Sequence, residues 1–245
     1  MQLTGMTRLR RDEGGFTLVE LLAAMMIAGF VLTALMYVFI TGLQNTTKAT
    51  DRLEGTQRAR LVVDRLVTLL NSQVCVTSGG VKSAVAPGSN ASSITFYADL
   101  GGVSDAPDRY TITYNQADRT LTEQRVQGSG VYPNVSFPGP TTQRVDQKIW
   151  PAVVGGEVQP VFRYYGFNDD GTISSTPLPI GQNGLSAQNA ARVVKVTVAL
   201  AAAGDHSPTA PDQTATAVIG EAITPTFGQD IDPDTQASTP TVCPS

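Results

Sequence analysis

The stretch FTLVELLAAMMIAGFVLTALMYVFITGL, residues 16–43, decides the fold class of this 245-residue chain. Twenty-two of its 28 residues are apolar, and Glu20 carries its only charge. As a helix it would be about 42 Å long, which exceeds the ~30 Å hydrocarbon core of a bilayer. It is also longer than the roughly 7–15 apolar residues of an ordinary secretory signal. We therefore expect residues 16–43 to form a membrane-spanning helix.

The rest of the chain has a different composition. All 15 prolines lie at or after Pro87, and charged residues make up only 16% of the whole chain, against about 25% in typical soluble domains. The chain thus joins a proline-free apolar part to a polar, loop-rich part. This distribution excludes a disordered chain, a collagen-like chain and a multi-pass membrane protein.

Basic residues flank the apolar stretch unevenly. Arg8, Arg10 and Arg11 precede it, whereas the first charge after it is Lys48. Because positive charges favour the cytoplasmic side of a membrane helix, the N-terminus is expected in the cytoplasm and the bulk of the chain outside it.

Glu20 is the feature that a simple membrane anchor does not explain. A carboxylate inside a spanning helix costs about 2.5–3.5 kcal/mol, so it needs a partner. Cleavage between Gly15 and Phe16 would create one, the α-amine of Phe16, about one helical turn from Glu20. In an assembly, the amine of one chain would meet Glu20 of the next chain and set the register between the two helices.

The string GFTLVELL at residues 15–22 resembles the prepilin cleavage and methylation motif of type IV pilins and type II secretion pseudopilins. The resemblance implies that residues 1–15 are a leader removed after Gly15 by a prepilin peptidase. It further implies that Phe16 becomes the N-methylated first residue and that Glu20 acts in assembly. The partners implied are other pilin or pseudopilin subunits, an inner-membrane assembly platform and, before assembly, membrane lipid.

The order of segments after the helix is similar to that of large minor pilins and J-type pseudopilins, on the strength of an aromatic strand at 160–165 and a Val/Arg strand at 191–196. The expected function is therefore a minor pilin or pseudopilin that ends in an extracellular or periplasmic filament. Two alternatives stay open. One is a pilus-borne adhesin or DNA-uptake receptor, and the other is a stationary single-pass anchored domain.

Apolar residues continue at helical spacing beyond the membrane stretch, and they share one face: Ala59, Val62, Val63, Leu66, Val67, Leu70 and Val74. The polar face carries Arg58, Asp64, Arg65, Thr68 and Asn71. This pattern predicts one helix over residues 16–74, spanning the membrane to about residue 43 and amphipathic afterwards. Two helices separated near Gly42 or Gly55 are the alternative, since glycine costs about 1 kcal/mol in a helix.

Strand patterns dominate residues 75–245. Short β-branched and aromatic runs recur at residues 94–98, 110–114, 120–126, 161–165, 193–200 and 214–219. Residues 115–118 indicate a hairpin loop, and residues 168–171 indicate a turn. No alternation of strands with helices is visible, so we expect an exported β-rich globular domain. The predicted fold class is α+β, a long N-terminal helix packed on an antiparallel sheet.

The two cysteines, Cys75 and Cys243, lie at the expected helix end and near the C-terminus. Paired cysteines in an exported domain usually form a disulfide, so we expect one here.

Metal and cofactor sites are not expected. Asp230, Asp232 and Asp234 have a spacing that would offer oxygen ligands to calcium, but the glycine and distal glutamate of an EF-hand are missing. A solvated acidic tail is the better interpretation. The single histidine, His206, lies in a loop-like stretch without a nucleophile turn, and no phosphate-binding or dinucleotide motif is present. We expect no enzyme activity.

Nucleic-acid binding is also not expected. The formal net charge is −4, whereas binding to phosphates favours a clustered basic surface. Arg58, Arg60 and Arg65 are close in sequence, but on a helix they are more simply explained as a solvated face.

Overall fold

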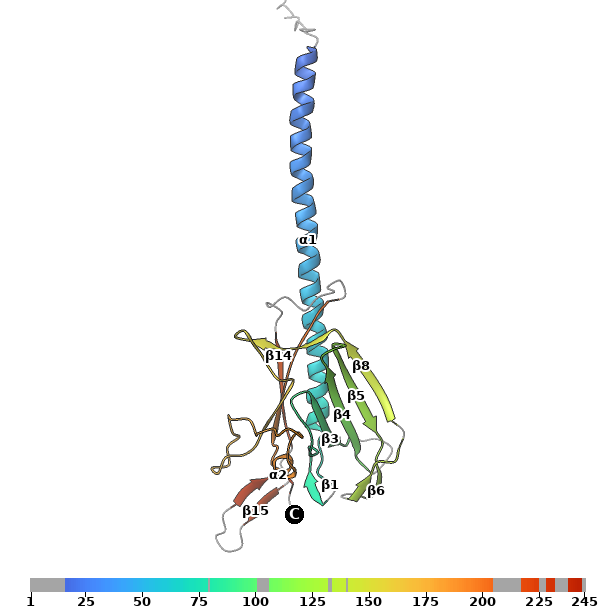
Figure 1. Cartoon of the computed structure of the whole chain (residues 1–245), viewed down its shortest axis with the longest axis vertical. Coiled ribbons are helices and arrows are strands. Elements are labelled where there is room, and N and C mark those ends of the chain that lie inside the picture. Colours follow the sequence, from blue (N-terminus) through green and yellow to red (C-terminus); the bar gives the residue numbers. More distant parts are fainter. Residues whose placement is uncertain are drawn as a thin grey trace, which may run out of the picture. The chain divides into compact units, whose positions relative to one another are not determined.

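The computed structural model describes residues 16–78, 80–100, 106–131, 134–139, 141–204, 217–224, 228–231 and 238–243. Its helices are α1 (Leu18–Asn71) and α2 (Ala187–Ala191) (Figure 1). Its strands are β1 (Val76–Ser78), β2 (Val81–Ser83), β3 (Ser93–Ala98), β4 (Asp108–Asn115), β5 (Thr120–Val126), β6 (Ser129–Val131), β7 (Asn134–Ser136), β8 (Thr141–Gln147), β9 (Ile149–Pro151), β10 (Val153–Val154), β11 (Glu157–Val158), β12 (Phe162–Tyr165), β13 (Lys195–Ala202), β14 (Val218–Ile223), β15 (Gly228–Ile231) and β16 (Ser238–Thr241).

The chain forms two compact units, Met1–Lys48 and Ala49–Ser245, and α1 contributes residues to both. In the first unit the apolar side chains of α1 are exposed; Phe30, for example, retains 70% of its accessible surface. Within the part of the chain that the structure describes, α1 is the one helix that is long and apolar enough to cross a membrane.

The α1 residues of the second unit bury the face that the sequence pattern predicts. Its buried residues are Gly55, Ala59, Val62, Val63, Leu66, Leu69 and Leu70. Asp64, Arg65 and Thr68 on the opposite face are exposed. α1 continues through Gly42 and Gly55, so the two-helix alternative is wrong.

Two antiparallel sheets pack against this part of α1. One has the strand order β3-β4-β5-β8, and the other has the order β12-β13-β14 with β9 also paired to β13. Figure 1 shows β3, β4, β5 and β8 along one side of the helix and β14 along the other. Buried residues from α1 and from both sheets form the main hydrophobic core, and Val76, Ala86 and Tyr97 form a second, smaller cluster. This arrangement is the α+β, pilin-like architecture that the sequence predicts.

Most of the predicted strands lie where the sequence places them. Residues 94–98, 110–114, 120–126 and 161–165 correspond to β3, β4, β5 and β12. The β4–β5 hairpin pairs Tyr114 with Leu121, and its loop is closed by Asn115, whose Oδ1 accepts a bond from the Ala117 N–H at 2.9 Å. Gly171, with φ 80°, closes the other predicted turn.

Two predicted strands differ from the structure in their bounds, and ten strands, most of them short, have no counterpart in the prediction. The run at 193–200 becomes β13, Lys195–Ala202, and the run at 214–219 becomes β14, Val218–Ile223. Both strands extend through small residues whose strand propensity is low, because neighbouring strands pair with them. β8 was not predicted at all. Its sequence TTQRVDQ lacks apolar alternation because six of its seven residues are exposed at a sheet edge.

Gly55 lies against the backbone of β13, where an added Cβ would overlap the carbonyl oxygen of Ala202. An alanine normally stabilises a helix by about 1 kcal/mol relative to glycine. Here the overlap is with backbone, which cannot rotate away, and overpacking costs about 1–3 kcal/mol. We therefore expect Gly55→Ala to lower the midpoint of urea unfolding of the full chain in detergent, followed by the fluorescence of its single tryptophan, Trp150.

Gly42→Ala is the matched control, since no atom lies within 4 Å of the Cβ that would be added there. This variant should unfold at the wild-type urea concentration or above it. If Gly55→Ala and Gly42→Ala unfolded at the same urea concentration, the stability of the protein would not depend on the close approach of α1 to β13.

Candidate functional site

Thr17 and Glu20 bind each other at the start of α1. The backbone N–H and the hydroxyl of Thr17 each donate to Glu20 Oε2 at 3.0 Å. In return, the backbone N–H of Glu20 donates to Thr17 Oγ1 at 3.3 Å. These reciprocal bonds form a capping box, which satisfies N–H groups that have no partner within the helix. The positive end of the helix dipole also favours a carboxylate at this position.

Glu20 therefore has a partner within a single uncleaved chain. The sequence predicts the amine of Phe16 as its partner after cleavage, and this pairing stays a prediction because Gly15 lies outside the described residues. The spacing Thr-x-x-Glu just before an apolar run is a recognised signal for a capping box, and it would have identified Thr17 from the sequence. Phe16 is described, and 87% of its surface is exposed.

Other polar side chains in the apolar part of α1 bond within the helix. The hydroxyl of Thr33 donates to the carbonyl oxygen of Gly29, and that of Thr41 donates to the carbonyl oxygen of Tyr37, both at 2.8 Å. Such bonds reduce the cost of placing a hydroxyl in hydrocarbon. Glu20 is the only charged side chain in residues 16–43. Its charge therefore still requires a positively charged partner for neutralisation.

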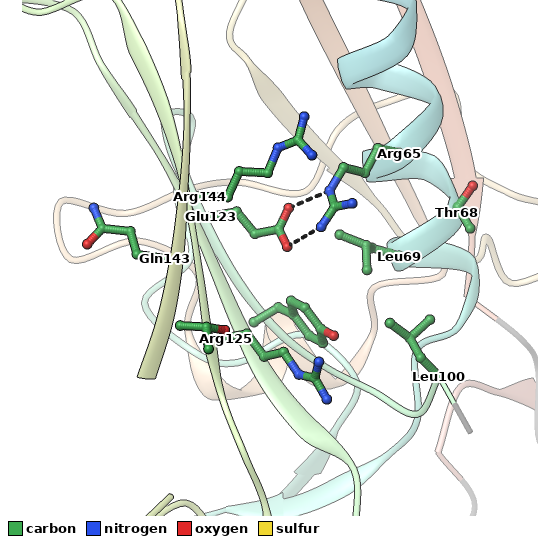
Figure 2. Close-up of a pocket in the computed structure, with 10 residues that line it drawn as sticks. Arg65, Thr68, Leu69, Leu100, Glu123, Arg125, Gln143 and Arg144 are labelled. Carbon is green, nitrogen blue, oxygen red and sulfur yellow. Dashed lines mark hydrogen bonds and ion pairs between the residues drawn. The ribbon is translucent and has the colours of Figure 1, made fainter. Parts of the chain in front are cut away.

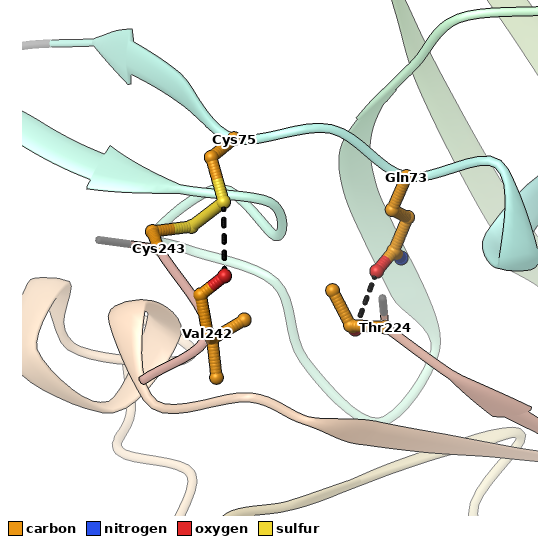
Figure 3. Close-up of a disulfide and its surroundings, with 5 residues drawn as sticks. All are labelled: Gln73, Cys75, Thr224, Val242 and Cys243. Atoms are coloured by element: carbon orange, nitrogen blue, oxygen red, sulfur yellow. Dashed lines mark hydrogen bonds between the residues drawn. A yellow bond between two sulfur atoms is a disulfide. The ribbon is translucent and has the colours of Figure 1, made fainter. Parts of the chain in front are cut away.

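Cys75 and Cys243 form a disulfide that ties the C-terminal segment to the chain just after α1 (Figure 3). Their Cα atoms are 5.7 Å apart across a sequence separation of 168 residues. Beside the disulfide, the hydroxyl of Thr224 donates to Gln73 Oε1 at 2.7 Å. The end of α1 is thus attached both to the residue after β14 and to the C-terminal segment.

A groove of about 510 Å³ lies between α1 and the β3-β4-β5-β8 sheet (Figure 2). Its lining residues are Arg65, Thr68, Leu69, Leu100, Tyr110, Glu123, Arg125, Thr142, Gln143 and Arg144. A helix about 10 Å wide cannot cover four strands spaced about 4.8 Å apart. The core that α1 shares with this sheet includes Leu121 of β5, whereas Arg125 of β5 and six of the seven residues of β8 stay exposed.

Ion pairs organise the groove. Arg65 Nε and Nη2 donate to the two carboxylate oxygens of Glu123, both at 2.8 Å, which joins α1 to β5. Arg125 bonds Asp108 across β4 and β5 at 2.7 Å. The hydrogen bond to Glu123 raises the pKa of Arg65 above its usual value, and burial raises the pKa of Tyr110. Both residues therefore keep their protons throughout the physiological pH range.

The groove was not predicted from the sequence. Strands β4 and β5 place Asp108, Glu123 and Arg125 at positions where alternation points inward. Charged residues at inward positions of a strand are a sequence signal for a polar groove. The sequence does not show which residues they pair with, because the pairing depends on strand register and on the position of α1.

The remaining candidate residues that the structure describes do not form a common site. Arg58 pairs with Glu54 at 3.1 Å and Arg65 with Glu123, so two of the three arginines considered for DNA binding are held in ion pairs. Asp230 lies in β15, while Asp232, Asp234 and His206 lie outside the described residues. Among the residues described, no three His, Cys, Asp or Glu side chains are placed to hold a metal ion.

Comparison with known protein families matches residues 10–36 to the prokaryotic N-terminal methylation motif. The match includes Gly15, Phe16 and Glu20 and extends into the long apolar helix. No curated protein and no solved structure matches the chain. The methylation motif and the long apolar helix are together consistent with a type IV pilin-like protein, and the motif implies processing by a prepilin peptidase.

Proposed function

We propose that the chain is a pilin-like structural subunit, a minor pilin or pseudopilin rather than an enzyme. It would insert with its N-terminus in the cytoplasm, be cleaved after Gly15, be methylated on the amine of Phe16 and then assemble into a filament. The observation that carries the proposal is the methylation motif at residues 10–36, which leads into a helix whose large apolar side chains stay exposed from Leu18 to Leu43.

Glu20 is the residue to which we assign assembly. In the uncleaved chain its carboxylate caps the helix through Thr17. Cleavage would add a positive charge one residue before Thr17, within reach of that carboxylate or of the carboxylate of a neighbouring subunit. The pair would neutralise both charges as the helix leaves lipid for the filament, and it would set the axial register between subunits.

Glu20→Gln separates the capping role from the charge. Glutamine can replace glutamate in a capping box, so the start of α1 should be preserved while the charge is lost. We expect normal cleavage and N-methylation, measured by mass spectrometry of the N-terminal peptide. We also expect at least a tenfold loss of the subunit from sheared filaments, measured by immunoblotting in the source organism.

Glu54→Gln is the control, because Glu54 also lies on α1 but pairs with Arg58 within the second unit. It should be incorporated normally. Normal incorporation of Glu20→Gln would refute the role given to its charge. If the wild-type protein did not begin at N-methyl-Phe16, the result would instead support a stationary membrane-anchored domain.

A further inference from the structure

The groove between α1 and β8 has the size and the lining of a ligand site, and no step of filament assembly accounts for it. Its volume of about 510 Å³ falls in the range of about 300–1,000 Å³ that is typical of small-molecule sites. Leu100 supplies accessible apolar surface, since half of its surface is exposed, while Leu69 lines the groove from α1 but is 4% exposed. The opposite wall is polar and comes from β5 and β8 (Figure 2).

The accessible charge of the groove is positive although its ion pairs balance. The side chains of Arg65, Arg125 and Arg144 are 43%, 44% and 50% exposed. Their carboxylate partners on Glu123, Asp108 and Asp146 are only 10%, 10% and 21% exposed. A solute that enters the groove therefore meets guanidinium groups, while the acids lie beneath them.

Each of the three guanidinium groups also keeps one nitrogen outside its ion pair. Arg65 and Arg144 contact their carboxylates through Nε and Nη2, and Arg125 does the same with Asp108. The Nη1 group of each arginine is thus not part of the pair. The carboxylates hold the guanidinium planes in place, which lowers the conformational entropy that binding would cost.

We propose that the groove binds a small organic carboxylate. The carboxylate accepts hydrogen bonds from Nη1 groups of the arginines, and the apolar part of the ligand lies against Leu100. A hydrogen bond from a charged guanidinium to a carboxylate is about twice as strong as one between neutral groups, so the remaining Nη1 groups favour an anionic ligand. Tyr110 also lines the groove, and because burial raises the pKa of its hydroxyl it adds no negative charge there.

Isothermal titration calorimetry on the full chain in nanodiscs of zwitterionic lipid tests the proposal, with 3-phenylpropionate as the probe. The neutral 3-phenylpropionamide has the same shape and should bind at least tenfold more weakly. Inorganic phosphate, which lacks the apolar part, should also bind more weakly. No measurable binding of 3-phenylpropionate, or equal binding of any two of these probes, would overturn the proposal.

Arg144→Gln should weaken the binding of 3-phenylpropionate about tenfold, since a charge-assisted bond is lost. Arg192→Gln is the matched control because it removes the same charge from an exposed arginine at the end of α2, outside the groove. Its affinity should equal that of the wild type.

Leu100→Ala tests the apolar contact at an exposed position where folding does not depend on the side chain, and it should also weaken binding. Wild-type affinity in both Arg144→Gln and Leu100→Ala would exclude the groove as the site.

Discussion

Replacing both Cys75 and Cys243 with serine is expected to lower the free energy of unfolding of the second unit by about 3–5 kcal/mol. The disulfide closes a loop with a sequence separation of 168 residues, and the entropy that such a loop removes from the unfolded chain grows with loop length. The folded structure also loses a tie between the C-terminal segment and the end of α1. Because total stabilities of about 5–15 kcal/mol are usual, the variant should be close to unfolding at physiological temperature.

Urea unfolding of the full chain in detergent, followed by Trp150 fluorescence, measures this effect. The control is the wild-type chain with and without dithiothreitol, since reduction should reproduce most of the loss. The double serine variant should not respond to dithiothreitol. Equal unfolding midpoints for oxidised wild type and the double variant would show that the disulfide does not stabilise the domain.

Leu70→Ala is expected to destabilise the second unit by about 2–5 kcal/mol, the range for a fully buried leucine. Leu70 retains 0% of its accessible surface and belongs to the core that α1 shares with both sheets. Its removal leaves a cavity in the core that α1 shares with both sheets. The loss should appear in the same urea titration as a lower midpoint.

Leu61→Ala is the matched control on the same helix. Leu61 is 72% exposed, and substitutions at exposed positions usually change stability by less than about 0.5 kcal/mol. If Leu70→Ala and Leu61→Ala gave the same midpoint, the helix would not be packed on the sheets as the structure places it.

The sequence predicted best where the signal is local. The buried face of α1 follows from apolar residues at helical spacing, because α-helical geometry places residues three and four apart on the same side. The β4–β5 hairpin follows from alternation on both sides of Asn115 and from the turn chemistry of the loop. The boundaries of β13 and β14 were predicted less well, because strand pairing with neighbours overrides the weak propensity of alanine and glycine.

The groove and the close packing of α1 could not be predicted in this way. Glu123 faces Arg65 across a sequence separation of 58 residues, and nothing near either residue specifies that pairing. The two helix glycines are a further example. The sequence suggests Gly42 and Gly55 equally as possible helix breaks, but in the structure the space around Gly42 is open while the backbone of Ala202 lies against Gly55.

The sequence by itself determined the long helix, its change from an apolar to an amphipathic surface, the single charge of Glu20 and the methylation motif. These features depend on the identity and spacing of residues within a few helical turns. Only the tertiary structure decided that α1 approaches β13 closely at Gly55, that Arg65 of α1 pairs with Glu123 of β5, and that three arginines meet in one groove. Those outcomes depend on side-chain geometry, strand register and the relative widths of a helix and a sheet, which local sequence does not specify.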